Sequence, residues 1–93
     1  MAYFAVEYAY SDETIPGRDE VRPDHRAWLG GLVDAGVVVS SGPYPDGSGA
    51  LIIFAESDLA AVEQRLNDDP FHKSDLIEAV RINEWKPVLG TFS

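Results

Sequence analysis

One histidine and one aspartate are the residues of this chain best suited to acid–base chemistry. His25 lies on the apolar stripe of a predicted helix, because at roughly 100° per residue Leu29 and Leu32 fall within about 40° of it. An inward imidazole needs a partner, and Asp69, in Asn67-Asp68-Asp69-Pro70-Phe71, is the best candidate. Imidazole exchanges protons near neutral pH, and a carboxylate that accepts its N–H would orient the ring. The pattern predicts a His–carboxylate site in a small apolar pocket.

Both residues also have a purely structural interpretation. A lone histidine on an apolar face is often a core residue, and an aspartate before a proline often only ends a helix. Asp68 could replace Asp69 if the turn is rotated. The second histidine, His72, follows Phe71 in a polar segment and is expected to be exposed rather than catalytic. One of the four tyrosines could line the pocket, but the sequence does not indicate which.

Three further residues are predicted to bind the negative charge of a ligand. Arg22 lies one turn before His25 and about 60° around the helix, where its guanidinium could bind a carboxylate or phenolate. Alternatively, Arg22 reaches solvent or pairs with an acidic residue. Ser41 and Gly42 end a predicted strand, where a backbone N–H could stabilise an anion, although a turn at Gly42-Pro43 also explains them. No nucleophile elbow surrounds Ser41, so a nucleophilic serine is not expected.

Length and composition limit the classes of function. The 93 residues are expected to form one domain, and the net charge of −9 would repel phosphate backbones and anionic membrane surfaces. We therefore expect neither a nucleic-acid nor a membrane partner. The absence of cysteine excludes a disulfide scaffold, a zinc–thiolate site and a cysteine nucleophile. The N-terminal residues do not resemble a signal peptide, which predicts a cytoplasmic location.

No cofactor and no metal are expected. The sequence contains neither a G-x-G-x-x-G motif nor a phosphate-binding loop. A metal site built from His25, Asp69, His72 and Asp75 would match no established ligand spacing. The chemistry must then be accessible to acid–base catalysis alone, on a small-molecule ligand.

Hydrophobic periodicity and turn residues predict four strands and two helices. The strands are expected at 2–10, 37–41, 50–55 and 76–85, the helices at 23–35 and 57–68, and a hairpin loop at 45–49. Residues 11–20 contain Pro16-Gly17 without periodicity and are predicted to form a loop. Pro23 suits a first helical turn, Gly36 a left-handed cap and Ser57 an N-cap.

The predicted order is β-α-β-β-α-β, the ferredoxin-like α+β arrangement. Both helices should cross one side of a four-stranded antiparallel sheet. The other side is also apolar on the first and third strands, through Tyr3, Ala5, Ala9, Leu51 and Ile53. An apolar face of several hundred Å² is large for a soluble monomer. We therefore expect a homodimer that packs sheet to sheet.

An ordered set of short motifs runs through the chain. The motifs are Arg22-x-x-His25-x-x-Trp28-Leu29, Gly36, Ser41-Gly42-Pro43, Asp69-Pro70-Phe71 and Trp85. In this set the chain resembles the YciI-like (YCII-related) family over nearly its whole length. The resemblance implies a ferredoxin-like fold that dimerises into an α/β barrel, with an active site around His25 and Asp69. Most members of the family that this chain resembles have no assigned reaction. A few of them act on chlorinated or hydroxylated aromatic compounds, including by dehydrochlorination.

The sequence departs from the family pattern at two places. Trp28 stands where a smaller, tyrosine-like ring is common, which would reshape the pocket. His72-Lys73-Ser74-Asp75 replaces the usual small and glycine residues after the Asp-Pro motif.

Two functions fit these residues. The first is a small cofactor-independent lyase or isomerase that moves a proton on a cyclic or aromatic anion. His25 would shuttle the proton, Asp69 would orient the ring, and Arg22 with strand-end amides would hold the anion. The alternative is a non-catalytic dimeric module that binds a small molecule or serves as an accessory subunit. In that case the His–Asp pair would only fix the two helices together.

Overall fold

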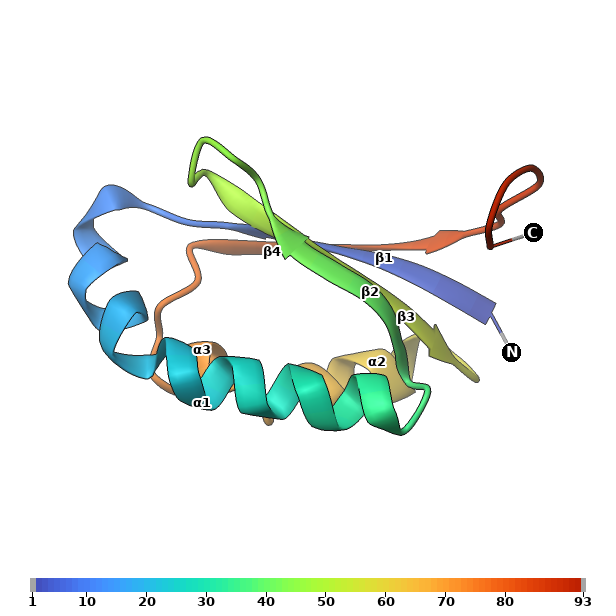
Figure 1. The fold of residues 1–93 in the computed structure, drawn as a ribbon, viewed down its shortest axis with the longest axis horizontal. Helices are drawn as coiled ribbons and strands as arrows, with labels where there is room; N and C mark the ends of the chain where they lie inside the picture. The colour runs from blue at the N-terminus through green and yellow to red at the C-terminus, as the bar shows by residue number, and fades with distance from the viewer. Residues whose placement is uncertain (1, 93) are drawn as a thin grey trace.

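The chain folds into a four-stranded antiparallel sheet with all its helices on one side (Figure 1). The computed structural model describes residues 2–92. In chain order the elements are β1 (Ala2–Ala9), a 3-10 helix (Asp12–Thr14), α1 (Ile15–Asp34), β2 (Val38–Pro43), β3 (Gly49–Glu56), α2 (Leu59–Leu66), α3 (Pro70–Lys73) and β4 (Ala79–Trp85). The strand order is β2-β3-β1-β4. The predicted ferredoxin-like βαββαβ class is confirmed, and α3 is one added helical turn.

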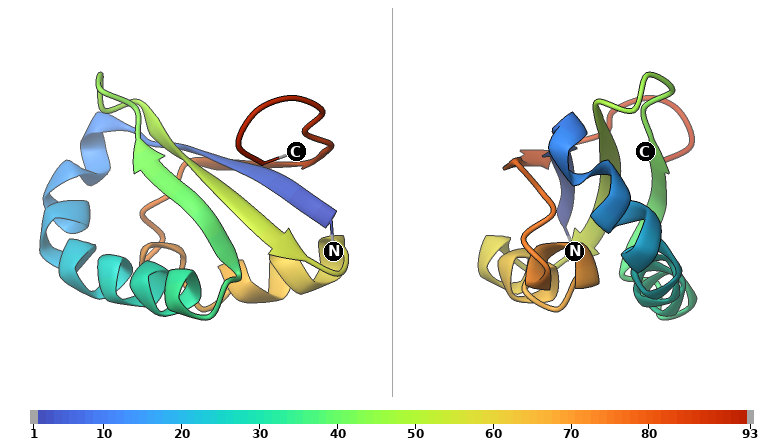
Figure 2. Two further views of the ribbon diagram at one scale, coloured as in Figure 1. Left: turned by 45° about the vertical axis from the view of Figure 1, so that its right-hand side comes forward. Right: turned by 90° about the vertical axis from the view of Figure 1, so that its left-hand side faces the viewer.

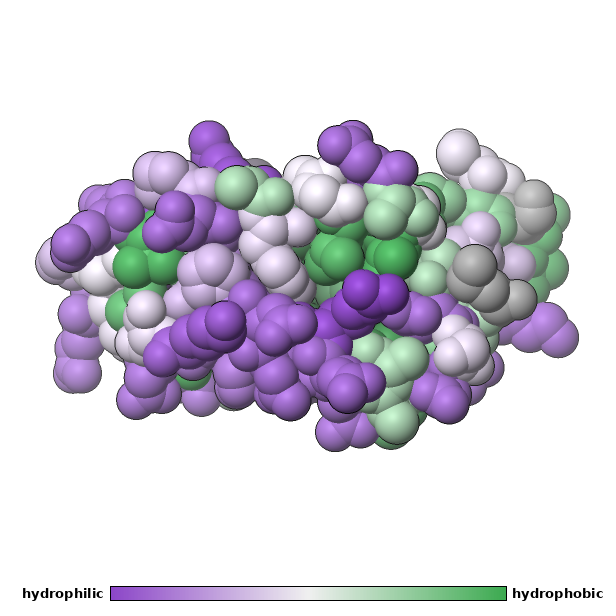
Figure 3. Space-filling view, turned by 90° about the horizontal axis from the view of Figure 1, so that it is seen from below, coloured by the Kyte–Doolittle hydropathy of each residue, from purple (hydrophilic) through white to green (hydrophobic). Residues whose placement is uncertain are grey.

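The core lies between the sheet and the helices. Residues paired across antiparallel strands project to the same side, so alternate residues of β1 and β3 form one apolar layer. The buried residues of this layer are Phe4, Val6, Tyr8, Ala50, Ile52 and Phe54. Leu32, Val62 and Leu66 cover it from α1 and α2. The outer surface of the helices carries mainly hydrophilic residues, with apolar ones visible in patches (Figure 3).

The other side of the sheet carries no helix (Figures 1 and 2). The segment after β4 folds back over one end of this side, where Phe92 contacts Tyr3 and Trp85 at centroid distances of 6.2 and 5.9 Å. Val88 and Leu89 in this segment are 74% and 89% exposed. The homodimer that would cover this face stays a prediction. No helix within residues 2–92 is long and apolar enough to cross a membrane.

The first helix begins earlier than the sequence indicates. α1 starts at Ile15, so the prediction of a loop over 11–20 is wrong. Pro16 lies in the first turn, where its missing N–H costs no helical bond. Arg18 is only 5% exposed, and its guanidinium lies 4.2 Å from the centroid of the Tyr10 ring. Tertiary contacts of this kind stabilise a polar segment that has no apolar periodicity.

Pro23 lies inside α1 and not in its first turn. It has no N–H to donate to the carbonyl of Asp19, and a proline at this position kinks a helix. α1 changes direction along its length, so that its first part rises toward the end of the sheet while its second part runs beneath it (Figure 2). The second part carries His25.

The boundaries of α2 differ from those predicted. Asp58 rather than Ser57 is the N-cap of α2, and its side chain accepts a hydrogen bond from the N–H of Ala61. The helix ends at Leu66 rather than near Asp68. An aspartate caps a helix as well as a serine does, so the sequence alone does not separate two adjacent capping residues.

Two strand boundaries also differ. β2 continues through Gly42 and Pro43, because it is an edge strand and a proline there interrupts no central ladder. β4 begins at Ala79 rather than at Leu76, whose side chain lies against Gly17 of α1. The predicted left-handed conformation of Gly36 is confirmed, with φ of 77°.

Candidate active site

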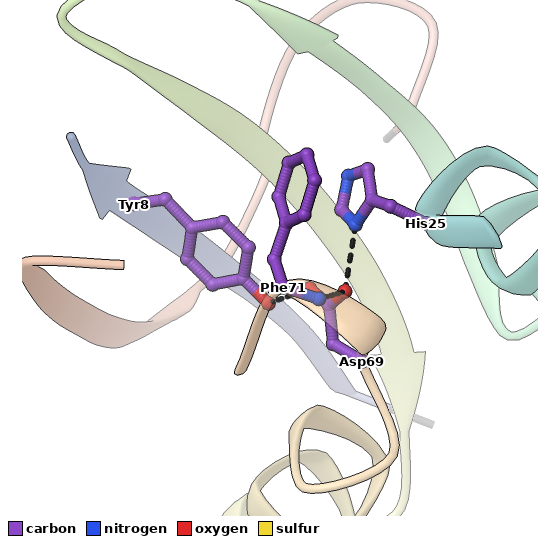
Figure 4. A network of polar contacts seen from close by, with 4 residues as sticks. All are labelled: Tyr8, His25, Asp69 and Phe71. Atoms are coloured by element: carbon purple, nitrogen blue, oxygen red, sulfur yellow. Dashed lines mark hydrogen bonds and ion pairs between the residues drawn. The ribbon is translucent and has the colours of Figure 1, made fainter. Parts of the chain in front are cut away.

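α1 and α3 bring His25 and Asp69 into direct contact. The Nδ1 atom of His25 lies 2.7 Å from Oδ1 of Asp69 (Figure 4). His25 is 7% exposed and Asp69 is fully buried. Pro70 occupies the first turn of α3 and keeps Asp69 in an extended conformation, as its N-cap. The carboxylate therefore turns back to accept the N–H of Phe71 at 2.9 Å.

A tyrosine from the sheet is the third partner of this carboxylate. The hydroxyl of Tyr8 donates to Oδ2 of Asp69 at 2.6 Å (Figure 4). Burial, and then the adjacent charge of Asp69, raise the pKa of Tyr8 well above its ordinary value, so the phenol stays protonated and remains a donor. An ionised carboxylate can only accept, which makes Nδ1 of His25 the donor in the dyad. In a neutral ring the proton then resides on Nδ1, and Nε2 has a free lone pair.

The second ring nitrogen of His25 faces the pocket. Nε2 lies on the side of the ring away from Asp69 (Figure 4). No residue within 2–92 hydrogen-bonds Nε2, yet every fully buried side-chain nitrogen or oxygen in that range has a partner. Nε2 is therefore accessible from the pocket that His25 lines. A group placed in this pocket could exchange a proton with it.

Aromatic rings fix the plane of the imidazole. The Phe71 ring stacks on the His25 ring, with centroids 3.9 Å apart and an interplanar angle of 3°. Trp28 lies 6.0 Å from the same imidazole, tilted by 33°. Tyr10 meets Phe71 edge-on at 6.1 Å. The carboxylate and these rings together leave the imidazole little freedom to rotate.

The pocket has a volume of about 410 Å³ and lies between α1, α3 and the strands β2 and β3. Its apolar walls are formed by Tyr10, Leu29, Val33, Pro43, Ala50 and Phe71. Its polar side chains come from Arg22, His25, Arg26 and Ser41. A largely apolar cavity with a few convergent polar groups is typical of small-molecule sites.

The structure brings the predicted site residues together around this pocket. His25, Arg22, Ser41 and Gly42 line it, and Asp69 lies behind His25. Ser41 and Gly42 both belong to β2, which ends at Pro43. Arg22 also pairs with Asp19, at 2.7 Å, so it lines the pocket while keeping an acidic partner.

No specific role for Tyr8, Tyr10 or Arg26 is predicted from the sequence. Strand alternation places Tyr8 on the helix-facing side, but its partner Asp69 is 61 residues away along the chain. Tyr10 is the tyrosine that lines the pocket. His72 is exposed on α3, as predicted. Within residues 2–92, no three His, Cys, Asp or Glu side chains are arranged to hold a metal ion.

The chain is similar in sequence to one protein family and in fold to solved structures. The YCII-related domain model matches residues 1–86. The fold is similar to that of 5-chloro-2-hydroxyhydroquinone dehydrochlorinase (TftG) from Burkholderia phenoliruptrix AC1100, solved in complex with 2,5-dihydroxybenzoquinone. The TM-score is 0.81 at 22% identity, over 90% of this chain and 93% of that chain. Protein Atu4242 from Agrobacterium tumefaciens is also similar, with a TM-score of 0.58 at 21% identity, over 95% of this chain and 94% of that chain. No curated protein matches significantly. At these identities the two likenesses show the fold.

Proposed function

This chain belongs to the YCII-related domain family, and we propose that it is a small cofactor-independent enzyme of the lyase or isomerase type. It moves a proton on a small cyclic or aromatic anion, with His25 as the acid–base residue and Asp69 as its orienting partner. The observation that most supports this is the 2.7 Å contact between the two side chains at the wall of a 410 Å³ pocket. The Burkholderia dehydrochlorinase, which binds a hydroxylated quinone ring, supports the same ligand class.

The proposed reaction has two proton transfers. Nε2 of His25 removes a proton from a carbon or hydroxyl of the bound ring, and the bonding electrons move into the ring system. Asp69 stabilises the resulting imidazolium through Nδ1–H. The imidazolium then returns the proton to another ring atom, which gives an isomerisation, or to a departing group, which gives an elimination. Either course leaves His25 neutral again.

Three residues around the pocket are proposed to hold the anion. Arg22 contributes a positive charge from α1. Ser41 and Gly42 lie on β2 and line the same cavity, where a hydroxyl and backbone N–H groups can donate to an oxygen of the ligand. This arrangement would present the ligand to Nε2 of His25.

One observation favours the alternative of a non-catalytic binding or accessory module. The carboxylate of Asp69 is fully buried and has Tyr8, His25 and the Phe71 N–H as partners. A network so completely satisfied would also serve to join α1, α3 and β1. The two functions differ in what the loss of His25 does to a bound molecule.

The function is tested by proton exchange on ring compounds. Hydroxylated and halogenated aromatic compounds are incubated with the protein in D₂O, and loss of ring proton signals and release of halide are followed by NMR and ion measurement. We expect exchange or release that disappears in His25→Ala, while His72→Ala, the matched exposed histidine, keeps it. Circular dichroism checks that both variants are folded. If His25→Ala retains the full rate, the enzyme proposal is rejected in favour of the binding module.

We also propose that the chain forms a homodimer through the open side of the sheet. Leu51, Ile53 and Tyr3 project from that side, and Val88 and Leu89 are exposed in the segment that folds back over one end of it. Apolar residues on an open sheet face are commonly covered by a partner. Sedimentation should give the mass of a dimer at micromolar concentration. A monomer under these conditions would reject the proposal.

A further inference from the structure

The pocket is cationic although the chain is acidic. The sequence has 16 acidic and 7 basic residues and a net charge of −9. The residues that line the pocket nevertheless include two arginines and no aspartate or glutamate. Arg18, Arg22 and Arg26 follow one another at four-residue spacing on α1. A local excess of positive charge in an acidic protein attracts an anionic ligand to this cavity.

The three arginines differ in their partners. Arg18 is buried, donates to the carbonyl of Ser11 at 3.0 Å and does not line the pocket. Arg22 lines the pocket, but its guanidinium is already paired with Asp19 at 2.7 Å. Arg26 lines the pocket, and no ion pair or hydrogen bond joins its side chain to any other residue within 2–92. Arg26 therefore has the guanidinium that is available to a ligand.

The walls around Arg26 favour a flat ring. The Phe71 and Tyr10 rings form one part of the pocket, and Leu29 and Pro43 form others. Aromatic and aliphatic surfaces of this kind bind a planar apolar body, while an arginine fork binds an oxyanion at its edge. Arg26 follows His25 directly on α1, so an anion held at Arg26 lies at the same end of the helix as the proton-exchanging nitrogen.

We propose that Arg26 is the specificity-determining residue of this pocket, and that its guanidinium binds the carboxylate or phenolate oxygen of a flat aromatic ring. Arg22 contributes to the local positive field but is not the main contact. The assignment rests on the proposed function, because it names the ligand class of the same site. Arg26 is not one of the motif residues in which the chain resembles the YCII-related family.

Binding of simple probes tests the assignment without knowledge of the substrate. Benzoate and 4-nitrophenolate are titrated into the protein and followed by NMR of the backbone amides. Benzamide serves as the neutral isostere of benzoate. The variants are Arg26→Gln, Arg22→Gln and Arg65→Gln. Arg65 is the matched control because it pairs with Glu56 on the far helix α2 and lies outside the pocket.

The expected result is an Arg26-dependent affinity for the anions. The Kd of benzoate, of 4-nitrophenolate or of both should rise about tenfold or more in Arg26→Gln, since a charge-assisted hydrogen bond is lost. The rise should be smaller in Arg22→Gln and absent in Arg65→Gln. Benzamide should bind weakly and equally to all four proteins. The anion with the lower Kd identifies whether a carboxylate or a phenolate is preferred.

Three results would overturn the assignment: no saturable binding of either anion to the unmodified protein, unchanged affinity in Arg26→Gln, or equal affinity for benzoate and benzamide. Failure of the proposed enzyme is distinguishable from failure of this assignment. His25→Ala should keep its affinity for the anion even where it loses proton exchange. Arg26-dependent binding without any proton exchange would reject the enzyme and support the anion site. Proton exchange at an unchanged rate in Arg26→Gln would support the enzyme and reject the anion site.

Discussion

Asp69 is a fully buried carboxylate that is surrounded by hydrogen-bond donors. It accepts hydrogen bonds from the Tyr8 hydroxyl, the Phe71 N–H and the His25 ring, and it caps α3. All three donors point at a group that is fully buried. A carboxylate satisfies this environment because it only accepts, whereas an amide of the same shape must present an NH₂ group, which only donates.

Asp69→Asn is therefore expected to cost stability as well as activity. The side-chain NH₂ would face a donor, and the free energy of unfolding should fall by about 1–3 kcal/mol. The His25 tautomer would no longer be enforced, so proton exchange should fall strongly. Urea unfolding followed by tryptophan fluorescence measures the first effect. Asp68→Asn is the matched control, because Asp68 is exposed, and it should change neither quantity.

Tyr8→Phe isolates the contribution of one hydrogen bond to the same carboxylate. The change leaves Oδ2 of Asp69 without its 2.6 Å partner, and we expect a loss of about 1–3 kcal/mol in unfolding free energy. Tyr10→Phe is the control for stability, since no hydrogen bond is found for the Tyr10 hydroxyl within residues 2–92. Equal effects of the two substitutions in urea unfolding would contradict this account of the network.

The sequence predicts the residues of this site only in part. Helix periodicity and the Asp-Pro motif indicate His25 and Asp69 because each signal is local. Tyr8 cannot be found in this way, since only the sheet brings it to Asp69. Arg26 is about 100° from His25 on the helix, so periodicity places it off the inward face. Arg26 lines the pocket nonetheless, and this position becomes apparent only in the tertiary structure.

Local sequence patterns predict the strands more closely than they predict the start of α1. Alternation identifies β1, because its buried and half-buried residues differ at every second position. β3 is instead a nearly continuous apolar run in which Ile52, Ile53 and Phe54 are all buried, as is typical of a central strand. The first turns of α1 have no such pattern. They are stabilised by Arg18, which reaches Ser11 and the Tyr10 ring, and by the Thr14 hydroxyl, which donates to the carbonyl of Leu76. Contacts between distant segments leave no local signal.

Close approach of β1 and β3 depends on a glycine. A Cβ at Gly49 would overlap the carbonyl oxygen of Tyr8, whereas one at Gly31 on α1 would meet nothing within 4 Å. We expect Gly49→Ala to lower the unfolding free energy by about 1–3 kcal/mol, because the backbone must shift. Gly31→Ala should instead raise it by up to about 1 kcal/mol through helix propensity. Thermal and urea unfolding of the two variants measure the difference in sign, and a neutral Gly49→Ala would contradict the tight strand spacing.

Two tyrosines, the buried Tyr8 and the partly buried Tyr10, link the stability of the fold to alkaline pH. Burial, and then the charge of Asp69, raise the pKa of Tyr8 above its ordinary value of 10.0, and the same causes raise that of Tyr10, against the opposing charges of Arg18 and Arg22. The folded protein thus keeps phenol protons that the unfolded chain releases. The stabilising effect is complete below pH 10 and is lost as pH rises above it toward the folded-state pKa.

We therefore expect the unfolding free energy to fall above pH 10, with Tyr8 contributing about 1.4 kcal/mol per pH unit to the slope. Tyr8→Phe removes this contribution, so its stability curve should run parallel to that of the unmodified protein below pH 10 and fall less steeply above it. Urea unfolding at a series of pH values gives both curves, and phenolate absorbance shows whether the Tyr8 proton leaves only on unfolding. An unchanged alkaline slope in Tyr8→Phe would mean that Tyr8 titrates freely in the folded protein. It would then not be held as a permanent donor to Asp69.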